Sequence, residues 1–223
     1  MIAESVNAAP QIAALFADGA VAYQTREPIA ANTLLPEEQQ FIQKAVPKRV
    51  HEFAGGRACA RAALAQLGFG EVALPMNANR APLWPPGATG SITHTDGFCA
   101  AVVATTSMIR ALGLDAEPAD SVRPHLWHRI CTPEEITNLE SLDAAAAIEI
   151  ATLIFSAKEA FYKCQHFLTG EWLGFLDISV TLMAESFTVR PTRSLQITAA
   201  APGPWHGRYL RVGDLVLTGA CII

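Results

Sequence analysis

The order of predicted elements along the chain restricts the fold more than any single motif does. A strand, a helix and further strands precede residue 110, and a strand, helices and further strands follow it. This order predicts an α+β protein of two similar lobes, residues 1–110 and 111–223, related by a pseudo-twofold axis. Each lobe is expected to hold a small, mainly antiparallel sheet packed with helices. No clear sequence repeat joins the two halves.

The first half contains one strongly patterned helix. Apolar residues keep helical spacing from Pro47 to Leu67, and Gly68 is placed to end the helix. A strand is predicted at Val21–Thr25 and a helix start at Pro36. Residues 75–90 are dense in Pro, Asn and Gly, which predicts a long ordered loop.

Strands are predicted again after this loop. The segments at 91–93, 98–104 and 111–117 have strand character, and a turn over 94–97 contains Asp-Gly. In the second half, Thr132 begins a capping box for one helix, and residues 144–167 form another. After Gly170 the chain predicts a sheet, with strands at 177–182, 187–190, 195–198, 209–212 and 215–222.

Composition excludes several classes of protein. The chain is 51% hydrophobic and 17% charged, which is typical of a globular protein. Its net charge of −5 argues against a nucleic-acid partner, since such proteins usually carry a basic excess. Five scattered cysteines without a CxxC pair indicate free thiols in a reducing compartment. Without a signal peptide or a long apolar run, we expect a cytoplasmic protein with no membrane span.

Two acids in the predicted strand at 111–117 suggest a cation site. Asp115 and Glu117 are two residues apart, so both carboxylates point to one face of the strand. Gly113 shares that face and would let a ligand approach closely. Carboxylate oxygens suit Mg²⁺, with Mn²⁺ as a possible substitute. Two solvated acids at the end of a strand would show the same pattern.

The segment FSAKEAFYK, residues 155–163, places Glu159 and Lys163 on one face of a helix, with Lys158 on an adjoining face. An ordinary helical ion pair or a capping box from Ser156 to Glu159 would also fit. The apolar flanks favour burial of these charges, and buried charges need partners.

Basic residues in the first half suggest an anion site. Arg57 interrupts the apolar stripe of the predicted helix, where it could meet a buried carboxylate, a phosphate or solvent. Arg49 and Arg61 are close enough to add to a phosphate pocket. His94 lies at the edge of a predicted turn, and the pair His125 and His128 has no third ligand that would indicate a metal site.

Taken in order, the motifs resemble those of a known family. KRVHEFAGGRACARAAL, NRAPLWPPGATGSITHTDG, GLDAEP and FSAKEAFYK, followed by WLGF, resemble the phosphopantetheinyl transferases of the larger, two-lobed class. That class is typified by the activating enzymes of surfactin and enterobactin synthesis. The resemblance implies transfer of 4′-phosphopantetheine from coenzyme A to a serine of an apo acyl or peptidyl carrier protein, with adenosine 3′,5′-bisphosphate released.

The resemblance also implies roles for individual residues. Asp115, Glu117 and Glu159 would bind Mg²⁺, with Glu159 also acting as the general base. Lys163, with Lys158 nearby, would neutralise charge on the leaving group. The residues implied to contact coenzyme A are Arg49, Arg57, Asn79, Arg80, Ala81, Pro82, Thr93, His94, Asp115, Lys158, Lys163 and Leu173. Thr93 stands where the family usually has Ser.

Two other functions fit the same residues. One is a magnesium-dependent phosphohydrolase that cuts a coenzyme A-like phosphoanhydride with water. The other is an inactive module that binds coenzyme A or a carrier protein. The resemblance further implies a monomer with coenzyme A bound at the junction of the lobes, in a pathway such as secondary metabolite biosynthesis.

Overall fold

The computed structural model describes residues 5–223, which divide into two compact units. Unit 1 ends at Arg110, and unit 2 spans Ala111–Ile222. Unit 1 has a sheet of strand order β1-β2-β4-β3, and unit 2 has one of order β5-β9-β8-β7-β6. All strand pairs in both sheets are antiparallel, so the prediction of two antiparallel sheets packed with helices is confirmed. The pseudo-twofold relation stays a prediction.

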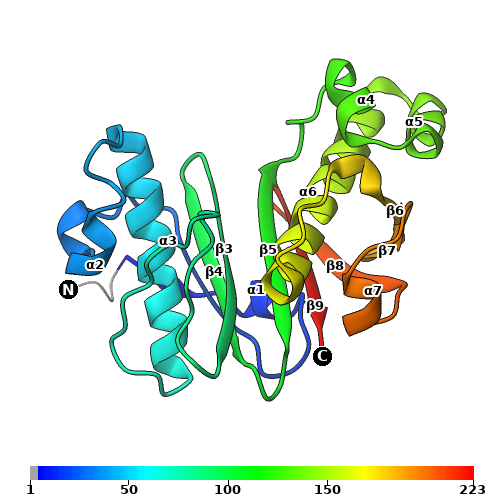
Figure 1. The fold of residues 1–223 in the computed structure, drawn as a ribbon. Coiled ribbons are helices and arrows are strands. Elements are labelled where there is room, and N and C mark those ends of the chain that lie inside the picture. Colours follow the sequence, from blue (N-terminus) through cyan, green and yellow to red (C-terminus); the bar gives the residue numbers. More distant parts are fainter. Residues whose placement is uncertain (1–4) are drawn as a thin grey trace. The chain divides into compact units, whose positions relative to one another are not determined.

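Unit 1 consists of short helices and one long helix on a four-stranded sheet (Figure 1). Its elements are β1 (Asn7–Ala8), α1 (Pro10–Ala13), β2 (Val21–Thr25), the 3₁₀ turn η1 (Ala31–Thr33), α2 (Pro36–Gln39), α3 (Pro47–Gln66), β3 (Ala88–Thr95) and β4 (Phe98–Thr105). Helix α3 packs against β2, β3 and β4 over an apolar core that includes Phe53, Leu64 and Leu74.

Helix α3 ends where its sequence predicts. Gly68 adopts a left-handed conformation with φ of +84°. The N–H of Gly68 donates to Ala65 O and that of Phe69 donates to Leu64 O, at 3.0 Å each. This is the Schellman arrangement, which needs a residue that tolerates positive φ. The helix of 47–67 is therefore confirmed to within one residue.

The hairpin after α3 is longer than predicted. Strand β3 begins at Ala88 instead of residue 91, and His94 belongs to the strand. Only Asp96 and Gly97 form the turn, with Gly97 at φ of +65°. The Gly- and Pro-rich composition of 85–90 favoured a loop, but the pairing of β3 with β4 outweighs it.

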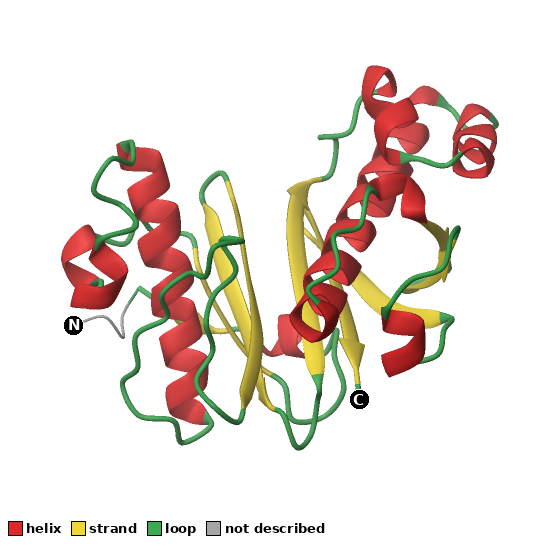
Figure 2. Ribbon diagram, viewed as in Figure 1, coloured by secondary structure: helices red, strands yellow, loops and turns green. Residues whose placement is uncertain are grey.

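Unit 2 contains the longest helix of the described chain, α6, lying across a five-stranded sheet (Figure 2). Its elements are β5 (Ala111–Pro118), η2 (Pro124–Leu126), α4 (Trp127–Ile130), α5 (Pro133–Glu140), α6 (Ala144–Thr169), η3 (Phe175–Asp177), β6 (Ile178–Leu182), β7 (Ser186–Pro191), α7 (Ile197–Ala200), β8 (Trp205–Val212) and β9 (Leu215–Ile222). Helix α6 packs mainly on β5 and β9.

Two predictions for unit 2 have opposite outcomes. The capping box is confirmed, because Glu135 N donates to Thr132 Oγ1 at 3.3 Å and Thr132 N donates to Glu135 Oε2 at 2.6 Å. The strand at 195–198 is wrong. Its apolar and β-branched residues instead lead into the short helix α7, whose Ile197 is fully buried.

Gly113 allows α6 to pack directly on β5. A Cβ atom at Gly113 would lie 1.9 Å from the carbonyl oxygen of Ala160 and 2.7 Å from the backbone N of Cys164. Both atoms belong to α6. The expectation that Gly113 lets a ligand approach is therefore wrong, since the helix backbone fills that space.

We predict that Gly113→Ala destabilises unit 2 by about 1–3 kcal/mol or more, because the clash is with backbone and not with a flexible side chain. Urea unfolding should show the loss. Gly174→Ala is the matched control, because its Cβ would meet Asp177 at an ordinary 3.6 Å. Equal stability of the Gly113 variant and the control would contradict this account of the packing.

None of the helices formed by residues 5–223 combines the length and the apolar character needed to span a membrane.

Candidate active site

Asp115 is held against α6 by two side chains of that helix. It is 5% exposed on β5. Its Oδ1 accepts from Lys163 Nζ at 2.7 Å, and its Oδ2 accepts from Ser156 Oγ at 2.8 Å. Both carboxylate oxygens are therefore oriented by α6, and two of the residues implied by the resemblance, Asp115 and Lys163, form an ion pair.

Glu117 and Glu159 are close enough to Asp115 to interact electrostatically. Burial raises the pKa of Glu117 to about 7, with added repulsion from Asp115 and, more weakly, Glu159. Burial also raises the pKa of Glu159, and Asp115 adds to this shift while Lys163 opposes it. The three predicted acids thus share one region of unit 2 with a single ammonium group, Lys163.

Lys163 joins the carboxylates to the strand backbone. Its Nζ donates to Leu114 O at 3.0 Å as well as to Asp115, and its side chain is 28% exposed. Glu159 and Lys163 lie one turn apart within the unbroken helix α6. The alternative of a capping box from Ser156 to Glu159 at a helix restart is therefore excluded.

Lys158 lies in the interior of unit 2, with 1% of its surface exposed. Its Nζ donates to Glu135 Oε2 at 2.7 Å, to Ile130 O at 2.9 Å and to Phe175 O at 3.0 Å. An ammonium group has three protons, and all three are used. We therefore correct the expectation of a ligand contact: Lys158 joins α4, α5, α6 and η3.

The three acids of unit 2 match Mg²⁺ in ligand type. Within residues 5–223, no three His, Cys, Asp or Glu side chains are arranged as a ready metal site. The chemistry of Asp115, Glu117 and Glu159 nevertheless suits a hard cation, because all three offer oxygen ligands. Burial is the main cause of the raised pKa of both glutamates, and repulsion from Asp115 adds to it, a repulsion that a bound cation would offset. The residues fit such an ion by charge and ligand type.

In unit 1, Arg49 and His94 meet at the start of α3. Arg49 Nη1 donates to His94 Nε2 at 2.8 Å. Because arginine only donates, the ring proton of His94 lies on Nδ1, which is 3.6 Å from Glu52 Oε2. Glu52 also lies 3.5 Å from Arg49. The two predicted anion-binding residues are thus together, with an acid that orients them.

Arg57 faces the core of unit 1, as its place on the apolar stripe predicts. It is 4% exposed, its guanidinium stacks 4.1 Å from the centre of the Phe53 ring, and Nε donates to Leu74 O at 2.9 Å. Burial lowers its pKa to about 10. Its Nη2 is buried and has no hydrogen-bond partner among the described residues. A buried donor without a partner needs an explanation such as a bound water or ion.

Arg61 does not lie with Arg49 and His94. It donates to Glu38 Oε2 at 2.7 Å and to Thr33 O at 2.8 Å, and it lines a different cavity. The expected contribution of Arg61 to a phosphate pocket is therefore wrong.

The predicted adenine-binding loop is folded by Asn77. Its Oδ1 accepts from Asn79 N at 2.9 Å and from Ala81 N at 3.0 Å, so these two backbone donors are already engaged. Met76 pairs with Pro82 across the turn. Arg80 has a φ of +64°, in the left-handed region that few side chains adopt.

Arg49 and Arg80 line one cavity of about 410 Å³ in unit 1. The other residues lining it are Gln40, Phe41, Gln43, Lys44, Ala45, Phe53 and Met76. Three cationic side chains beside two aromatic rings suit a ligand with phosphate and a flat heterocycle. Thr93 and Leu173 are buried, at 3% and 6% exposure, and their ligand contacts stay predictions.

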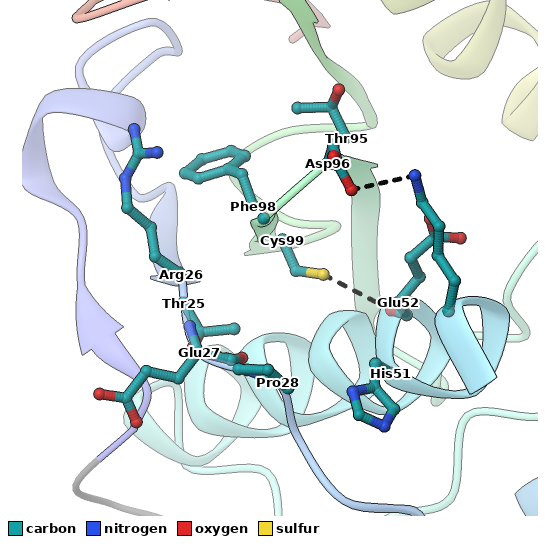
Figure 3. Close-up of a pocket in the computed structure, with 12 residues that line it drawn as sticks. Thr25, Arg26, Glu27, Pro28, His51, Glu52, Thr95, Asp96, Phe98 and Cys99 are labelled. Carbon is teal, nitrogen blue, oxygen red and sulfur yellow. Dashed lines mark hydrogen bonds and ion pairs between the residues drawn. The ribbon is translucent and has the colours of Figure 1, made fainter.

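Sequence reasoning missed a second cavity of unit 1, of about 260 Å³, shown in Figure 3. Arg26 lies 5.3 Å from the centre of the Phe98 ring, Lys48 pairs with Asp96 at 2.9 Å, and Cys99 donates to Glu52 O. Its walls come from β2, α3 and the β3–β4 turn, which are far apart in sequence. No local motif could have revealed it.

Comparison with known proteins identifies the family. The 4′-phosphopantetheinyl transferase N-terminal domain matches residues 37–104, and the 4′-phosphopantetheinyl transferase superfamily matches residues 111–218. The chain is 36% identical to 4′-phosphopantetheinyl transferase Svp of Streptomyces mobaraensis, over 85% of this chain and 78% of that protein. It is 41% identical to 4′-phosphopantetheinyl transferase Npt of Nocardia iowensis, over 67% of each. Enterobactin synthase component D of Escherichia coli is 34% identical, over 66% of this chain and 68% of that protein. The chain therefore belongs to the 4′-phosphopantetheinyl transferase family, of the larger type.

Proposed function

We infer that the protein transfers the 4′-phosphopantetheine group of coenzyme A to a serine of an apo acyl or peptidyl carrier protein. Adenosine 3′,5′-bisphosphate is the second product. The observation that carries this proposal is the group formed by Asp115, Glu117, Glu159 and Lys163 on β5 and α6. It joins acids that can hold a cation, a carboxylate with a raised pKa and an ammonium group.

In this proposal, Asp115, Glu117 and Glu159 hold Mg²⁺, or Mn²⁺ in its place. When bound, the ion supplies positive charge to the pyrophosphate of coenzyme A. Ser156 and Lys163 fix the orientation of Asp115 through its two oxygens. This fixed orientation lowers the reorganisation needed when substrate binds.

Glu159 acts as the general base. Its raised pKa makes it a better proton acceptor than an ordinary glutamate. The serine Oγ gives its proton to Glu159 and forms a bond to the β-phosphorus. The bond from that phosphorus to the bridging oxygen breaks, and Lys163 neutralises charge on the departing bisphosphate.

The basic residues of unit 1 bind the nucleotide part of coenzyme A. Arg49 and His94 contact the 3′-phosphate, and the free Nη2 of Arg57 offers a further donor. Arg80, with the turn of Asn79–Pro82, borders the adenine. The cavity that joins Arg49 and Arg80 supports this assignment.

Intact-mass analysis of an apo carrier protein tests the function. With coenzyme A and Mg²⁺, we expect the carrier to gain one phosphopantetheine group, and EDTA to prevent the gain. Free phosphopantetheine with an unmodified carrier would instead indicate the phosphohydrolase. Coenzyme A binding without either product would indicate the inactive module.

The same experiment on several carrier proteins would identify which of them the protein modifies. The particular carrier, its pathway, the monomeric state and the cytoplasmic location stay predictions from the sequence.

A further inference from the structure

Glu38 is a fully buried carboxylate at the junction of three segments of unit 1. Its exposed fraction is 0%, and it accepts from the backbone N–H groups of Leu35 at 3.0 Å and Leu74 at 2.9 Å. Arg61 Nη1 donates to both of its oxygens, at 2.7 and 2.9 Å. A buried carboxylate is costly unless it is paired and hydrogen-bonded, so these partners determine its position. Glu38 thereby connects α2, α3 and the chain that follows α3.

Leu74 is held by charged side chains through both of its backbone polar groups. Its N–H donates to Glu38, and its carbonyl accepts from Arg57 Nε at 2.9 Å. Leu74 belongs to no helix or strand, and it is fully buried. Glu38 and Arg57 therefore replace the regular pairing that would otherwise fix this part of the backbone.

The chain after Leu74 forms the turn that carries Arg80. Met76, two residues beyond Leu74, pairs with Pro82, and Asn77 closes the turn between them. No helix or strand lies between Leu74 and this turn. The position of Arg80 consequently depends on how Leu74 is anchored.

The cavity of about 410 Å³ is lined by residues that follow each partner of this hydrogen bond in the chain. One lining segment begins at Gln40, which follows Glu38 closely in the chain. A second lining segment is Met76 and Arg80, which follow Leu74, and Arg49 and Phe53 come from α3. The hydrogen bond from Leu74 to Glu38 therefore connects the two segments of chain that lead into this lining.

We propose that Glu38 is a positioning residue for coenzyme A, acting through Leu74 on the turn that carries Arg80. This rests on the proposed function, in which the cavity receives the nucleotide part of coenzyme A. Glu38 itself does not touch the substrate. It sets the separation of the cavity walls, and thus the affinity for the nucleotide.

Glu38→Gln tests the inference, with Glu37→Gln as the matched control on the same helix. Glutamine keeps the size but replaces one acceptor oxygen by an NH₂ donor. In either orientation this NH₂ group faces Arg61 and the backbone N–H of Leu35 or Leu74, which are all donors, so the set of bonds that Glu38 accepts cannot be kept. Glu37 is exposed. For Glu38→Gln we expect about tenfold weaker binding of coenzyme A by calorimetry, as for loss of one charged hydrogen bond. The control should bind as the wild type does.

Two further measurements separate positioning from general damage. Hydrogen exchange of the peptide spanning 72–82, without coenzyme A, should become faster in Glu38→Gln only. The KM for coenzyme A should rise while kcat at saturating coenzyme A and the KM for the carrier protein stay the same. Parallel losses in all three kinetic values would overturn the inference. If Glu38→Gln does not fold, Glu38→Asp keeps the charge for Arg61 with a shorter reach, and the same pattern is expected.

Arg49→Ala distinguishes failure of this inference from failure of the proposed function. If Arg49→Ala binds coenzyme A as the wild type does, the cavity is not the nucleotide site, whatever Glu38 does. If Arg49→Ala loses affinity while Glu38→Gln keeps both its affinity and its exchange rate, the function stands and the positioning role is refuted.

Discussion

Glu159→Gln is expected to lower kcat for carrier-protein modification by about 10²–10⁴-fold, the usual contribution of a positioned general base. Glutamine has nearly the same shape but cannot take a proton from the carrier serine. It also removes one negative charge from the group formed with Asp115 and Glu117. Binding of coenzyme A should largely persist, because the residues proposed for the nucleotide belong to unit 1.

The matched control is Glu149→Gln, on the same helix. The Glu149 side chain is 40% exposed and pairs with Arg211, an interaction worth about 0–1 kcal/mol. The kcat of Glu149→Gln should match that of the wild type. The rate of modification, followed by intact mass under single-turnover conditions, measures the chemical step. A Glu159→Gln enzyme with unchanged kcat would exclude Glu159 as the base.

Lys158→Met is expected to reduce the free energy of unfolding by about 3–5 kcal/mol, the usual effect of breaking a buried ion pair. The carboxylate of Glu135 would keep its bonds from Thr132 N and Val180 N but lose its counter-ion. The carbonyl groups of Ile130 and Phe175 would lose their donor as well. Urea unfolding measures the change.

Two companion variants make this result specific. Lys163→Met removes a partly exposed lysine, so we expect a smaller loss of stability but a larger loss of transfer activity. Lys158→Met combined with Glu135→Leu should regain part of the stability, because no uncompensated charge remains. A stable Lys158→Met protein with weak coenzyme A binding would restore Lys158 to the ligand site.

Local patterns predicted those parts of the fold whose causes are local. The end of α3 at Gly68, the capping box at Thr132 and the turn at Asp96–Gly97 all depend on a few adjacent residues. The helix α7 was missed because its few residues have strand-like composition, and the burial of Ile197 depends on tertiary packing that the local sequence does not show.

The residues of the candidate site show the same difference between local and tertiary causes. Period-two spacing placed Asp115 and Glu117 on one face of β5, and helical spacing placed Glu159 and Lys163 one turn apart. What covers a face depends on tertiary packing, so Gly113 was assigned to a ligand when α6 lies there. Helical spacing placed Lys158 and Lys163 on adjoining faces but could not show what each face meets. Their different faces of α6 give one of them buried Glu135 as its partner and the other Asp115.

The unbroken helix α6 has a consequence for how this enzyme can change. Ser156 and Lys163 contact Asp115 from the same helix that carries Lys158. Lys158 in turn binds Glu135 of the α4–α5 segment. A substitution that loosens the α4–α5 segment would let α6 tilt. The tilt would change the positions of Ser156 and Lys163, and so the orientation of Asp115, although none of these residues is itself substituted. Remodelling of the α4–α5 surface is therefore tolerated only where the ammonium of Lys158 keeps its three acceptors.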